Sequence, residues 1–302
     1  MVNKNIMRSP LFYVGDKYKL IDEIKSHFPP IINRLIEPFV GGGSVFLNVE
    51  ARSYLLNDID KTVIDLHNYL CSHSQNPSLF TEHLLTLIKK YGLSCSFLND
   101  SIPEELKKKF VKTYYAVYNK DSYQIIRKLY NKSNDRPIDL LYLLKIYGFN
   151  RMHRFNKNNE FNVPVGNVDF NKNVVDALSN YFSHVRQHEI IWHCQDFKDF
   201  LLSITFEKDD LIYLDPPYLI TFSEYNKLWN ENSERELLDL LDNLNLQKIN
   251  FAISNVTHYK GRTNEMFLEW SKKYKSHDIK SNYISYHDNS IKTFKEVLIT
   301  NF

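Results

Sequence analysis

The sequence predicts an α/β protein with an open sheet of seven strands, interrupted by a mostly helical insertion. In residues 1–70 and again in 171–302, short apolar runs that end in glycine, proline or acidic residues alternate with segments of helical apolar spacing. Between residues 71 and 170 this alternation stops and helical spacing dominates. We therefore expect a discontinuous domain, 1–70 and 171–302, and an inserted domain, 71–170.

The strands are expected at 34–38, 53–57, 190–194, 211–214, 249–254, 279–286 and 296–301. Helical stretches separate most of them, as at 234–244 and 264–274. The last two are joined by the turn sequence Asp288-Asn289-Ser290, which predicts an antiparallel hairpin at one edge of the sheet. In an open α/β sheet, ligands bind beyond the carboxyl ends of the strands. The residues that follow these strands are therefore the first candidates for a site.

The composition is that of an ordinary globular protein, with 302 residues, 43% hydrophobic and 25% charged residues. No apolar run is long enough for a transmembrane helix, and residues 1–10 contain no apolar secretory region. Cys71, Cys95 and Cys194 form no CxxC pair and have no metal-ligand spacing. We therefore expect no bound metal, no membrane association and a reducing cytoplasmic location.

Charge is distributed unevenly along the chain. Residues 104–172 contain 14 Lys and Arg against 7 Asp and Glu, a net +7, so the remainder carries +2 − 7 = −5. A basic central segment in an otherwise acidic chain suggests a surface that binds phosphates, as in nucleic-acid binding. The alternative is that basic runs such as 107–109 are solvated helix surface.

The strand expected at 211–214 ends in Asp215-Pro216-Pro217-Tyr218. Two consecutive prolines stop the strand because neither can donate to a sheet ladder. The tip offers the Asp215 carboxylate, the Pro216 carbonyl and the Tyr218 ring, which together could hold a planar group that bears an NH2. Taken alone, these four residues are equally compatible with a strand-ending turn.

The first strand runs into Glu37-Pro38-Phe39-Val40-Gly41-Gly42-Gly43-Ser44, and a helix is expected from Val45. The order Phe39-x-Gly41-x-Gly43 lacks the third glycine of the dinucleotide fingerprint, since Phe46 occupies that position. The missing third glycine disfavours an NAD-dependent oxidoreductase.

Asp58 follows the second strand, where nucleotide-binding α/β folds hold a ribose. We assign the cap of the next helix to Asp60.

An asparagine-rich link at 157–159 joins two aromatic runs, which predicts a β-hairpin. Basic and aromatic residues interleave on it, and this pattern suits a nucleic-acid groove. Arginine can form two hydrogen bonds to the edge of a guanine, and asparagine can do so with adenine. An aromatic ring can fill the gap left by an extruded base. The alternative is a surface hairpin whose phenylalanines pack inward.

Four stretches together resemble the Dam-like (D12 class, alpha-group) DNA adenine-N6 methyltransferases. They are the glycine loop at 37–44, the helix Tyr123-Gln-Ile-Ile-Arg127-Lys-Leu-Tyr-Asn131, the segment 147–166 and the Asp-Pro-Pro-Tyr tip. The resemblance implies a Rossmann-like S-adenosylmethionine-dependent methyltransferase sheet with an inserted DNA-recognition domain that carries the hairpin.

The resemblance also implies a role for individual residues. The catalytic tip would be Asp215, Pro216, Pro217 and Tyr218. S-adenosylmethionine would be held by Tyr13, Lys17, Phe39, Gly41, Gly43, Asp58, Asp196, Phe197 and Asp215. DNA would be bound by Arg127, Phe149, Asn150, Arg151, Arg154 and Asn162, with Arg154 reading a guanine and Phe149 inserting near the target pair.

The implied reaction is methyl transfer from S-adenosylmethionine to adenine N6 in duplex DNA after base flipping, at a short GATC-like or GA-containing site. Its partner is double-stranded DNA, and a cognate restriction endonuclease that acts separately would be compatible with it. Departures from the family pattern, such as Asn150-Arg-Met-His-Arg154 and Tyr13 in place of tryptophan, concern the sequence that is recognised. N4-cytosine methylation and a catalytically inactive DNA-binding protein are the alternatives to this reaction.

We expect residues 223–229 to be a loop that folds over the target base, or an ordinary loop.

Overall fold

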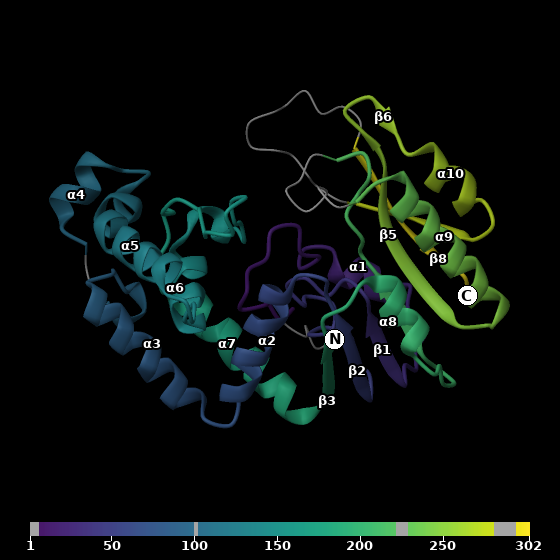
Figure 1. The fold of residues 1–302 in the computed structure, drawn as a ribbon, viewed down its shortest axis with the longest axis horizontal. Helices are drawn as coiled ribbons and strands as arrows, with labels where there is room; N and C mark the ends of the chain where they lie inside the picture. Colours follow the sequence, from purple (N-terminus) through teal and green to yellow (C-terminus); the bar gives the residue numbers. More distant parts are fainter. Residues whose placement is uncertain (1–5, 100–101, 222–228, 281–293) are drawn as a thin grey trace. The chain divides into compact units, whose positions relative to one another are not determined.

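The computed structural model describes residues 6–99, 102–221, 229–280 and 294–302 (Figure 1). Packing divides the chain into two compact units. The helical unit comprises Met1–Asp16, Gly41–Leu47 and Thr62–Gln187, and the sheet unit comprises Lys17–Val40, Asn48–Lys61 and His188–Phe302. These units are defined by packing alone, so the functional division at residues 71 and 170 stays a prediction.

In its described residues, the sheet unit is built on eight strands. They are β1 (Arg34–Glu37), β2 (Ser53–Asn57), β3 (Glu189–His193), β4 (Leu211–Leu214), β5 (Asn250–Tyr259), β6 (Arg262–Thr263), β7 (Lys275–Ile279) and β8 (Phe294–Thr300). Seven of them follow the order β3-β2-β1-β4-β5-β8-β7, and β6 pairs only with β5. The first five of this order are mutually parallel, whereas β8 runs antiparallel to both of its neighbours.

Apolar sequence explains the centre of this sheet. All four residues of β4 are buried, as are Leu35 and Ile36 of β1, as expected for parallel strands covered on both faces. The helices described in this unit are α1 (Ile21–Ser26), α8 (Phe197–Ser203), α9 (Glu231–Leu246) and α10 (Glu265–Ser271). The core is formed by α8, α9 and α10 against the sheet, with Leu237, Leu241 and Leu244 of α9 at helical spacing.

The far edge of the sheet differs from the sequence prediction. The two-residue strand β6 was not predicted, and its hairpin with β5 turns at Lys260 and Gly261, which both have positive φ. Strand β7 begins at Lys275 rather than at residue 279, because its sequence Lys-Ser-His-Asp-Ile carries almost no apolar signal. The expected antiparallel pairing at this edge is present between β7 and β8. The predicted turn at 288–290 lies outside the described residues.

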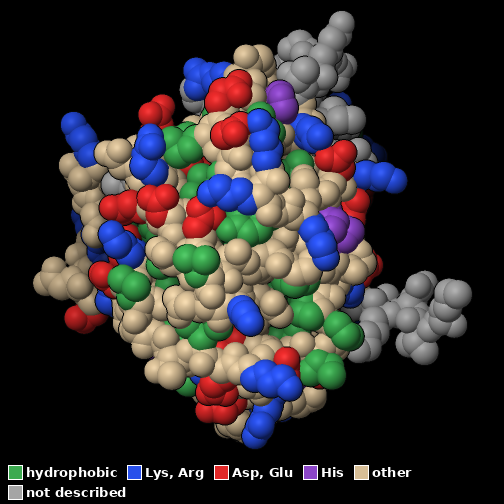
Figure 2. Space-filling model, turned by 90° about the vertical axis from the view of Figure 1, so that its right-hand side faces the viewer, with side chains coloured by type: hydrophobic (Ala, Val, Ile, Leu, Met, Phe, Trp, Pro, Cys, Tyr) green, Lys and Arg blue, Asp and Glu red, His purple; other side chains and the backbone are tan. Residues whose placement is uncertain are grey.

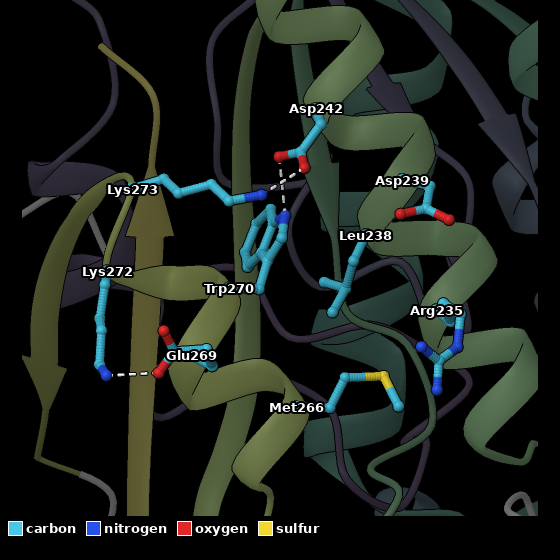
Figure 3. A pocket seen from close by; sticks show the side chains of 9 residues that line it. All are labelled: Arg235, Leu238, Asp239, Asp242, Met266, Glu269, Trp270, Lys272 and Lys273. Atoms are coloured by element: carbon cyan, nitrogen blue, oxygen red, sulfur yellow. Dashed lines mark hydrogen bonds and ion pairs between the residues drawn. The ribbon is translucent and has the colours of Figure 1, made fainter.

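A shallow cavity of about 510 Å³ lies between α9 and α10 of the sheet unit (Figure 3). Asp242 of α9 forms part of its wall. It accepts hydrogen bonds from Trp270 Nε1 at 2.8 Å, Lys273 Nζ at 2.6 Å and the Tyr274 hydroxyl at 2.6 Å. None of the predicted site residues lines this cavity. Among its polar groups, Asp242 of α9 is used to hold α10 and the residues that follow it.

The helical unit contains α2 (Lys61–His73, from Thr62 on), α3 (Pro77–Tyr91), α4 (Glu104–Lys109), α5 (Tyr114–Lys132), α6 (Ile138–Tyr147) and α7 (Lys172–Gln187), with short 3-10 turns at Ser96–Leu98 and Phe149–Arg151. Helix α6 is buried almost all round, from Leu140 to Tyr147. The predicted hairpin is a pair of antiparallel segments joined by two isolated bridges, Gly148 to Val165 and Phe155 to Phe161, rather than by regular strands.

The helix expected from Val45 is wrong. Residues 41–49 form successive turns, in which Gly41 and Gly43 adopt φ of +48° and +76°. Between Val45 and Asn48 the chain stays in turns, and the backbone hydrogen bond with helical spacing there, from the Leu47 amide to the Gly43 carbonyl, is long at 3.4 Å. The first helix after β1 is therefore α2, which begins only after β2.

On the face shown in Figure 2, Lys and Arg side chains alternate with Asp and Glu side chains, and hydrophobic side chains are scattered among them. No helix of the described chain is long and apolar enough to cross a membrane.

Candidate active site

The strand ends of the sheet unit gather most of the predicted catalytic and cofactor residues. Strands β1 and β4 are parallel neighbours, with Leu35 opposite Leu211 and Ile36 opposite Ile212. Their carboxyl ends therefore lie together, so that Phe39 and Asp215 each follow one of two adjacent strands. This is the edge at which open α/β sheets bind ligands.

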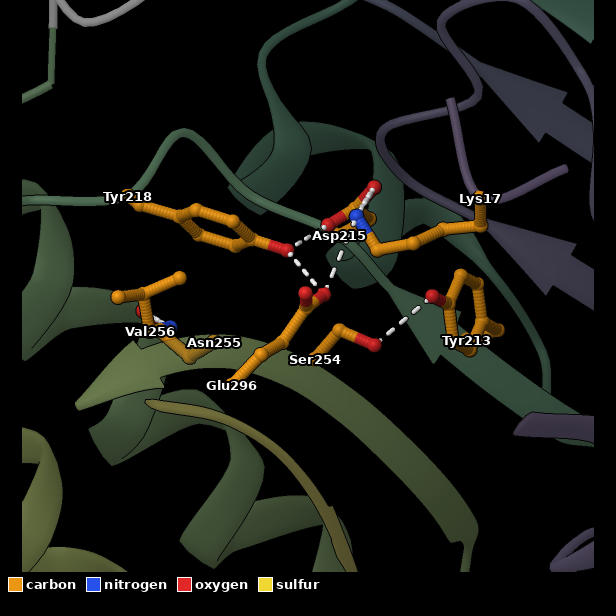
Figure 4. Close-up of polar contacts among 8 residues, drawn as sticks. All are labelled: Lys17, Tyr213, Asp215, Tyr218, Ser254, Asn255, Val256 and Glu296. Carbon is orange, nitrogen blue, oxygen red and sulfur yellow. Dashed lines mark hydrogen bonds and ion pairs between the residues drawn. The ribbon is translucent and has the colours of Figure 1, made fainter. Parts of the chain in front are cut away.

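Asp215 is held by two residues that were predicted from separate stretches (Figure 4). Lys17 Nζ lies 2.5 Å from Asp215 Oδ2, although the two residues are 198 positions apart. The Tyr218 hydroxyl lies 2.9 Å from Asp215 Oδ1, and Lys17 Nζ stands 5.2 Å from the centre of the Tyr218 ring. The Lys17 side chain is 3% exposed and that of Asp215 is 21% exposed. A buried ammonium thus compensates the charge of a carboxylate that solvent or a ligand can still reach.

Glu296 belongs to the same cluster and was missed by the sequence analysis. It lies on β8 with a fully buried side chain, and its Oε1 is 3.0 Å from the Tyr218 hydroxyl and 3.7 Å from Lys17 Nζ. The signal that could have revealed it is an acidic residue directly before the apolar run Val297-Leu298-Ile299 of the strand. Buried carboxylates are rare unless they are paired.

The two prolines occupy the turn directly after β4, with Pro216 buried and Pro217 half-buried. The chain then turns again, since both the amide and the hydroxyl of Thr221 donate to the Tyr218 carbonyl at 3.1 Å. This turn keeps the backbone of the tip close to the end of its strand.

Phe39 and Phe197, both predicted to bind the cofactor, pack against each other with ring centroids 5.4 Å apart. Trp229 completes the cluster at 5.7 Å from Phe39 and 5.5 Å from Phe197. Its indole donates a 2.7 Å hydrogen bond to Glu234, a buried carboxylate that also accepts from two asparagine side chains. Of the loop predicted at 223–229, only Trp229 lies within the described residues.

Asn57 at the end of β2 joins three strand ends. Its amide donates to the carbonyls of Pro38 and Gln195 at 3.0 Å, and its Oδ1 accepts from the Gln195 amide at 3.0 Å.

The predicted ribose ligand Asp58 accepts a 2.9 Å hydrogen bond from the Asp60 amide, just before α2. Asp196 caps α8 through the Lys198 amide, so its position is set by the helix that it starts.

In the helical unit, the glycine loop is closely packed by protein side chains. A Cβ atom on Gly42 would overlap that of Tyr13, and one on Gly43 would overlap the Phe46 ring. The ammonium of Lys145 lies 5.5 Å from the centre of the Tyr13 ring. Tyr13 therefore supports the loop directly, while Gly43 is required by both its φ and its neighbour.

His67 on α2 is a second residue that the sequence analysis missed. Its Nε2 lies 2.9 Å from the Gly41 carbonyl oxygen and its Nδ1 lies 3.0 Å from the Tyr181 hydroxyl. Burial lowers the pKa of His67 to about 4, so the ring is neutral at pH 7. A lone histidine on an apolar helix face gives no sequence signal of such a role.

Helix α5 clamps one segment of the predicted hairpin through three side chains spaced four residues apart. The Tyr123 hydroxyl and Arg127 Nη1 both donate to the Val163 carbonyl, at 3.1 and 3.2 Å. Asn131 exchanges two hydrogen bonds with the backbone of Phe161. Arg127, predicted to bind DNA, thus has a structural role in placing the hairpin.

Two other predicted DNA-binding residues contact each other. Arg154 donates through Nε to Asn162 Oδ1 at 2.8 Å and through Nη2 to the Asn162 carbonyl at 3.1 Å.

Phe149 is 49% exposed, and Asn150 beside it is exposed with φ of +50°. Arg151 stacks on the Phe12 ring, 3.8 Å from its centre, and burial lowers its pKa to about 10, which leaves it charged at pH 7.

A mostly parallel α/β sheet with a carboxylate tip after β4 is consistent with a methyltransferase fold. The chain belongs to the D12 class of N6 adenine-specific DNA methyltransferases, whose family model matches residues 13–285. In the described part of the chain, no group of three His, Cys, Asp or Glu residues could hold a metal ion.

Three relatives illustrate the similarity. The type II methyltransferase M.FokI of Planomicrobium okeanokoites is 35% identical over 98% of this chain, and the modification methylase StsI of Streptococcus sanguinis is 34% identical over 99%. In both cases the chain covers 43% of the relative, less than half of its length. A DNA adenine methylase of Haemophilus influenzae is 34% identical over 81% of this chain and 78% of its own.

Proposed function

We propose that this chain transfers a methyl group from S-adenosylmethionine to N6 of an adenine in duplex DNA. The observation that carries the proposal is the Asp215 carboxylate at the end of β4, hydrogen-bonded by Lys17 and Tyr218. The family to which the chain belongs and the adenine methylase named above support the choice of adenine. Because two of the relatives are more than twice as long, the activity of the whole protein is part of the proposal.

The adenine amine is a weak nucleophile because its lone pair is delocalised into the ring. Asp215 and the Pro216 carbonyl can each accept one N–H bond, which favours a more tetrahedral nitrogen that can attack a methyl group. The Tyr218 ring provides a surface on which the base can stack. Positioning of this kind can supply roughly 7–11 kcal/mol, against a cost of a few kcal/mol for extruding the base.

The residues present suit an adenosine-bearing cofactor rather than a dinucleotide. In the sheet unit, Phe39 and Phe197 form an apolar aromatic surface, and Asp58 offers a carboxylate to ribose hydroxyls. In the helical unit, Tyr13 and His67 pack on the glycine loop, which does not open a helix as a pyrophosphate-binding loop would. When bound, S-adenosylmethionine supplies an electrophilic methyl group on its sulfonium.

We propose further that residues 71–170 form the DNA-recognition domain within a Rossmann-like methyltransferase fold. Phe149, Asn150 and Arg154 are the candidates for contacts with bases at a short GATC-like or GA-containing site. The basic charge of residues 104–172 supports binding to phosphates. We expect the protein to act in the cytoplasm, and the modification methylases among its relatives support a separate restriction endonuclease as its counterpart.

The proposal is tested by incubating the purified protein with labelled S-adenosylmethionine and unmethylated bacterial DNA, followed by nucleoside chromatography and single-molecule sequencing. Label in N6-methyladenine at one short motif is the expected result. Label in N4-methylcytosine would overturn the substrate, and DNA binding without label would favour a catalytically inactive binding protein.

A further inference from the structure

The hydroxyl of Tyr218 stands between two carboxylates. Its oxygen lies 2.9 Å from Asp215 Oδ1 and 3.0 Å from Glu296 Oε1 (Figure 4). A tyrosine hydroxyl has a single proton, so it can donate to only one of these acceptors at a time. The two positions are nearly equal in distance, and the hydroxyl can therefore pass from one to the other by rotation about its C–O bond.

Glu296 is placed rigidly for this exchange. In β8 it pairs with Val256 of β5 on one side and with Ile279 of β7 on the other, so its backbone is fixed within the sheet. Its side chain is fully buried and points toward Tyr218 and Lys17 (Figure 4). Lys17 Nζ, 3.7 Å from Oε1, supplies the opposite charge that a buried carboxylate needs.

A further polar residue beside this cluster is Tyr213 on β4. Its hydroxyl is paired with Ser254 at 2.9 Å, and burial raises its pKa well above the ordinary value. Tyr213 therefore stays neutral and contributes no charge. Lys17, Asp215 and Glu296 are the charged side chains of the cluster in Figure 4.

We infer that Glu296 is a positioning residue for methyl transfer, acting through the Tyr218 hydroxyl. When the target amine donates to Asp215, the hydroxyl turns to Glu296, which frees the Asp215 Oδ1 lone pair to accept from the amine. The inference rests on the proposed function. It gives a reason for a buried acid on a strand remote in sequence from the catalytic tip.

A merely structural role for Glu296 is the competing explanation, and a double-mutant cycle separates the two. Glu296→Gln keeps the size of the side chain but weakens the acceptor, and Tyr218→Phe keeps the ring but removes the hydroxyl. We expect Glu296→Gln to lower kcat about tenfold, as for loss of a charged hydrogen bond. In the Tyr218→Phe background the same change should alter kcat less than about twofold, because the hydroxyl that carries the effect is absent.

The measurements are kcat and KM for a DNA duplex that contains the target adenine, with thermal unfolding as a check on folding. The matched control is Glu269→Gln, an exposed acid on α10, which should leave kcat unchanged. Equal losses of kcat from Glu296→Gln in both backgrounds would overturn the inference. So would a wild-type kcat for the Tyr218→Phe variant, a measurement that stays informative if the Glu296 variants fail to fold.

A second readout is the fluorescence of 2-aminopurine in place of the target adenine, which rises when the base leaves the stack. Glu296→Gln should leave this rise intact, since the residue acts on the amine-binding geometry and not on extrusion. Loss of the rise in step with kcat would overturn the inference. Failure of the wild-type protein to methylate any adenine would instead overturn the proposed function, and this inference with it.

Discussion

The imidazole of His67 is bonded to the glycine loop, with Nε2 2.9 Å from the Gly41 carbonyl oxygen. A carbonyl can only accept, so Nε2 carries the proton and Nδ1 accepts from the Tyr181 hydroxyl, 3.0 Å away. The tautomer is thus fixed by its two partners. Protonation at Nδ1 would remove the acceptor that Tyr181 uses and would place a charge in a fully buried position.

Stability should therefore fall as pH is lowered from about 6.5 to about 4. Burial lowers the pKa of His67 to about 4, while the unfolded chain binds the proton near pH 6.5. Between these values the unfolded state holds more protons, so the free energy of unfolding decreases with falling pH, by about 3 kcal/mol in all. The measurement is chemical denaturation at several pH values for the wild type and for His67→Gln.

The pH dependence should be shallower in His67→Gln over that interval, and at pH 7.5 the two proteins should differ only by the lost hydrogen bonds. Direct NMR titration of the His67 ring gives an independent check. A midpoint near 6.5 in the folded protein would contradict the assignment of a buried neutral ring.

Asp215→Ala should abolish methyl transfer, leave DNA binding within a few-fold of wild type, and weaken cofactor binding by no more than the one contact assigned to Asp215. The carboxylate is the acceptor for the target amine, whereas Tyr218 and Glu296 remain to hold Lys17 and the tip. Transfer is followed with labelled S-adenosylmethionine, and the two affinities by calorimetry and by gel shift. Turnover near the wild-type rate in this variant would contradict the catalytic assignment.

Arg154 and Asn162 should show coupled effects on sequence specificity. Because Asn162 holds Nε and Nη2 of Arg154 in one orientation, Asn162→Ala should relax the preference for the base that Arg154 contacts. Loss of the base contact itself, in Arg154→Ala, should cost about 1–3 kcal/mol of discrimination. The matched control is Lys157→Ala at the exposed turn, which should weaken binding to all sequences alike. Methylation of a library of duplexes measures each preference, and independent, additive effects would argue against the coupling.

Most of the fold could be predicted because its strands have strong local sequence patterns. The buried runs that became β1 and β4 were placed to within a residue, because apolar strands ended by proline have few alternative conformations. Strand β7 was misplaced because its residues are polar, and its pairing with β8 is a tertiary effect. The helix expected at Val45 is absent because the apolar residues Val45, Phe46 and Leu47 are buried in turns, and apolar spacing alone does not distinguish buried turns from a helix.

The candidate site was predicted only where its residues belong to a motif. Lys17, Asp215 and Tyr218 were named from their own stretches, and the structure brings them together. Glu296 and His67 lie outside any motif, and their importance comes from long-range contacts that no local pattern encodes. Arg127 was assigned to DNA, which stays a prediction, and its hydrogen bond to the Val163 carbonyl depends on the packing of α5, which no local pattern encodes.

Two glycines with the same positive φ give a matched test of the glycine loop. Gly43 and Gly261 both have φ of +76°, but a Cβ on Gly43 would overlap the Phe46 ring, while one on Gly261 would meet nothing within 4 Å. Gly261→Ala should cost about 1–2 kcal/mol from the left-handed conformation alone. Gly43→Ala should cost about 1–3 kcal/mol more, since the ring is buried and has no room to move.

Thermal and denaturant unfolding of both variants measures the difference. Truncating the neighbour, in Gly43→Ala combined with Phe46→Ala, should cost less than the sum of the two single changes, because the overlap is then removed. Equal losses from Gly43→Ala and Gly261→Ala would mean that only backbone strain matters at Gly43. The loop would then have room for a methyl group, and its glycine would have to be explained by close approach of a ligand rather than by Phe46.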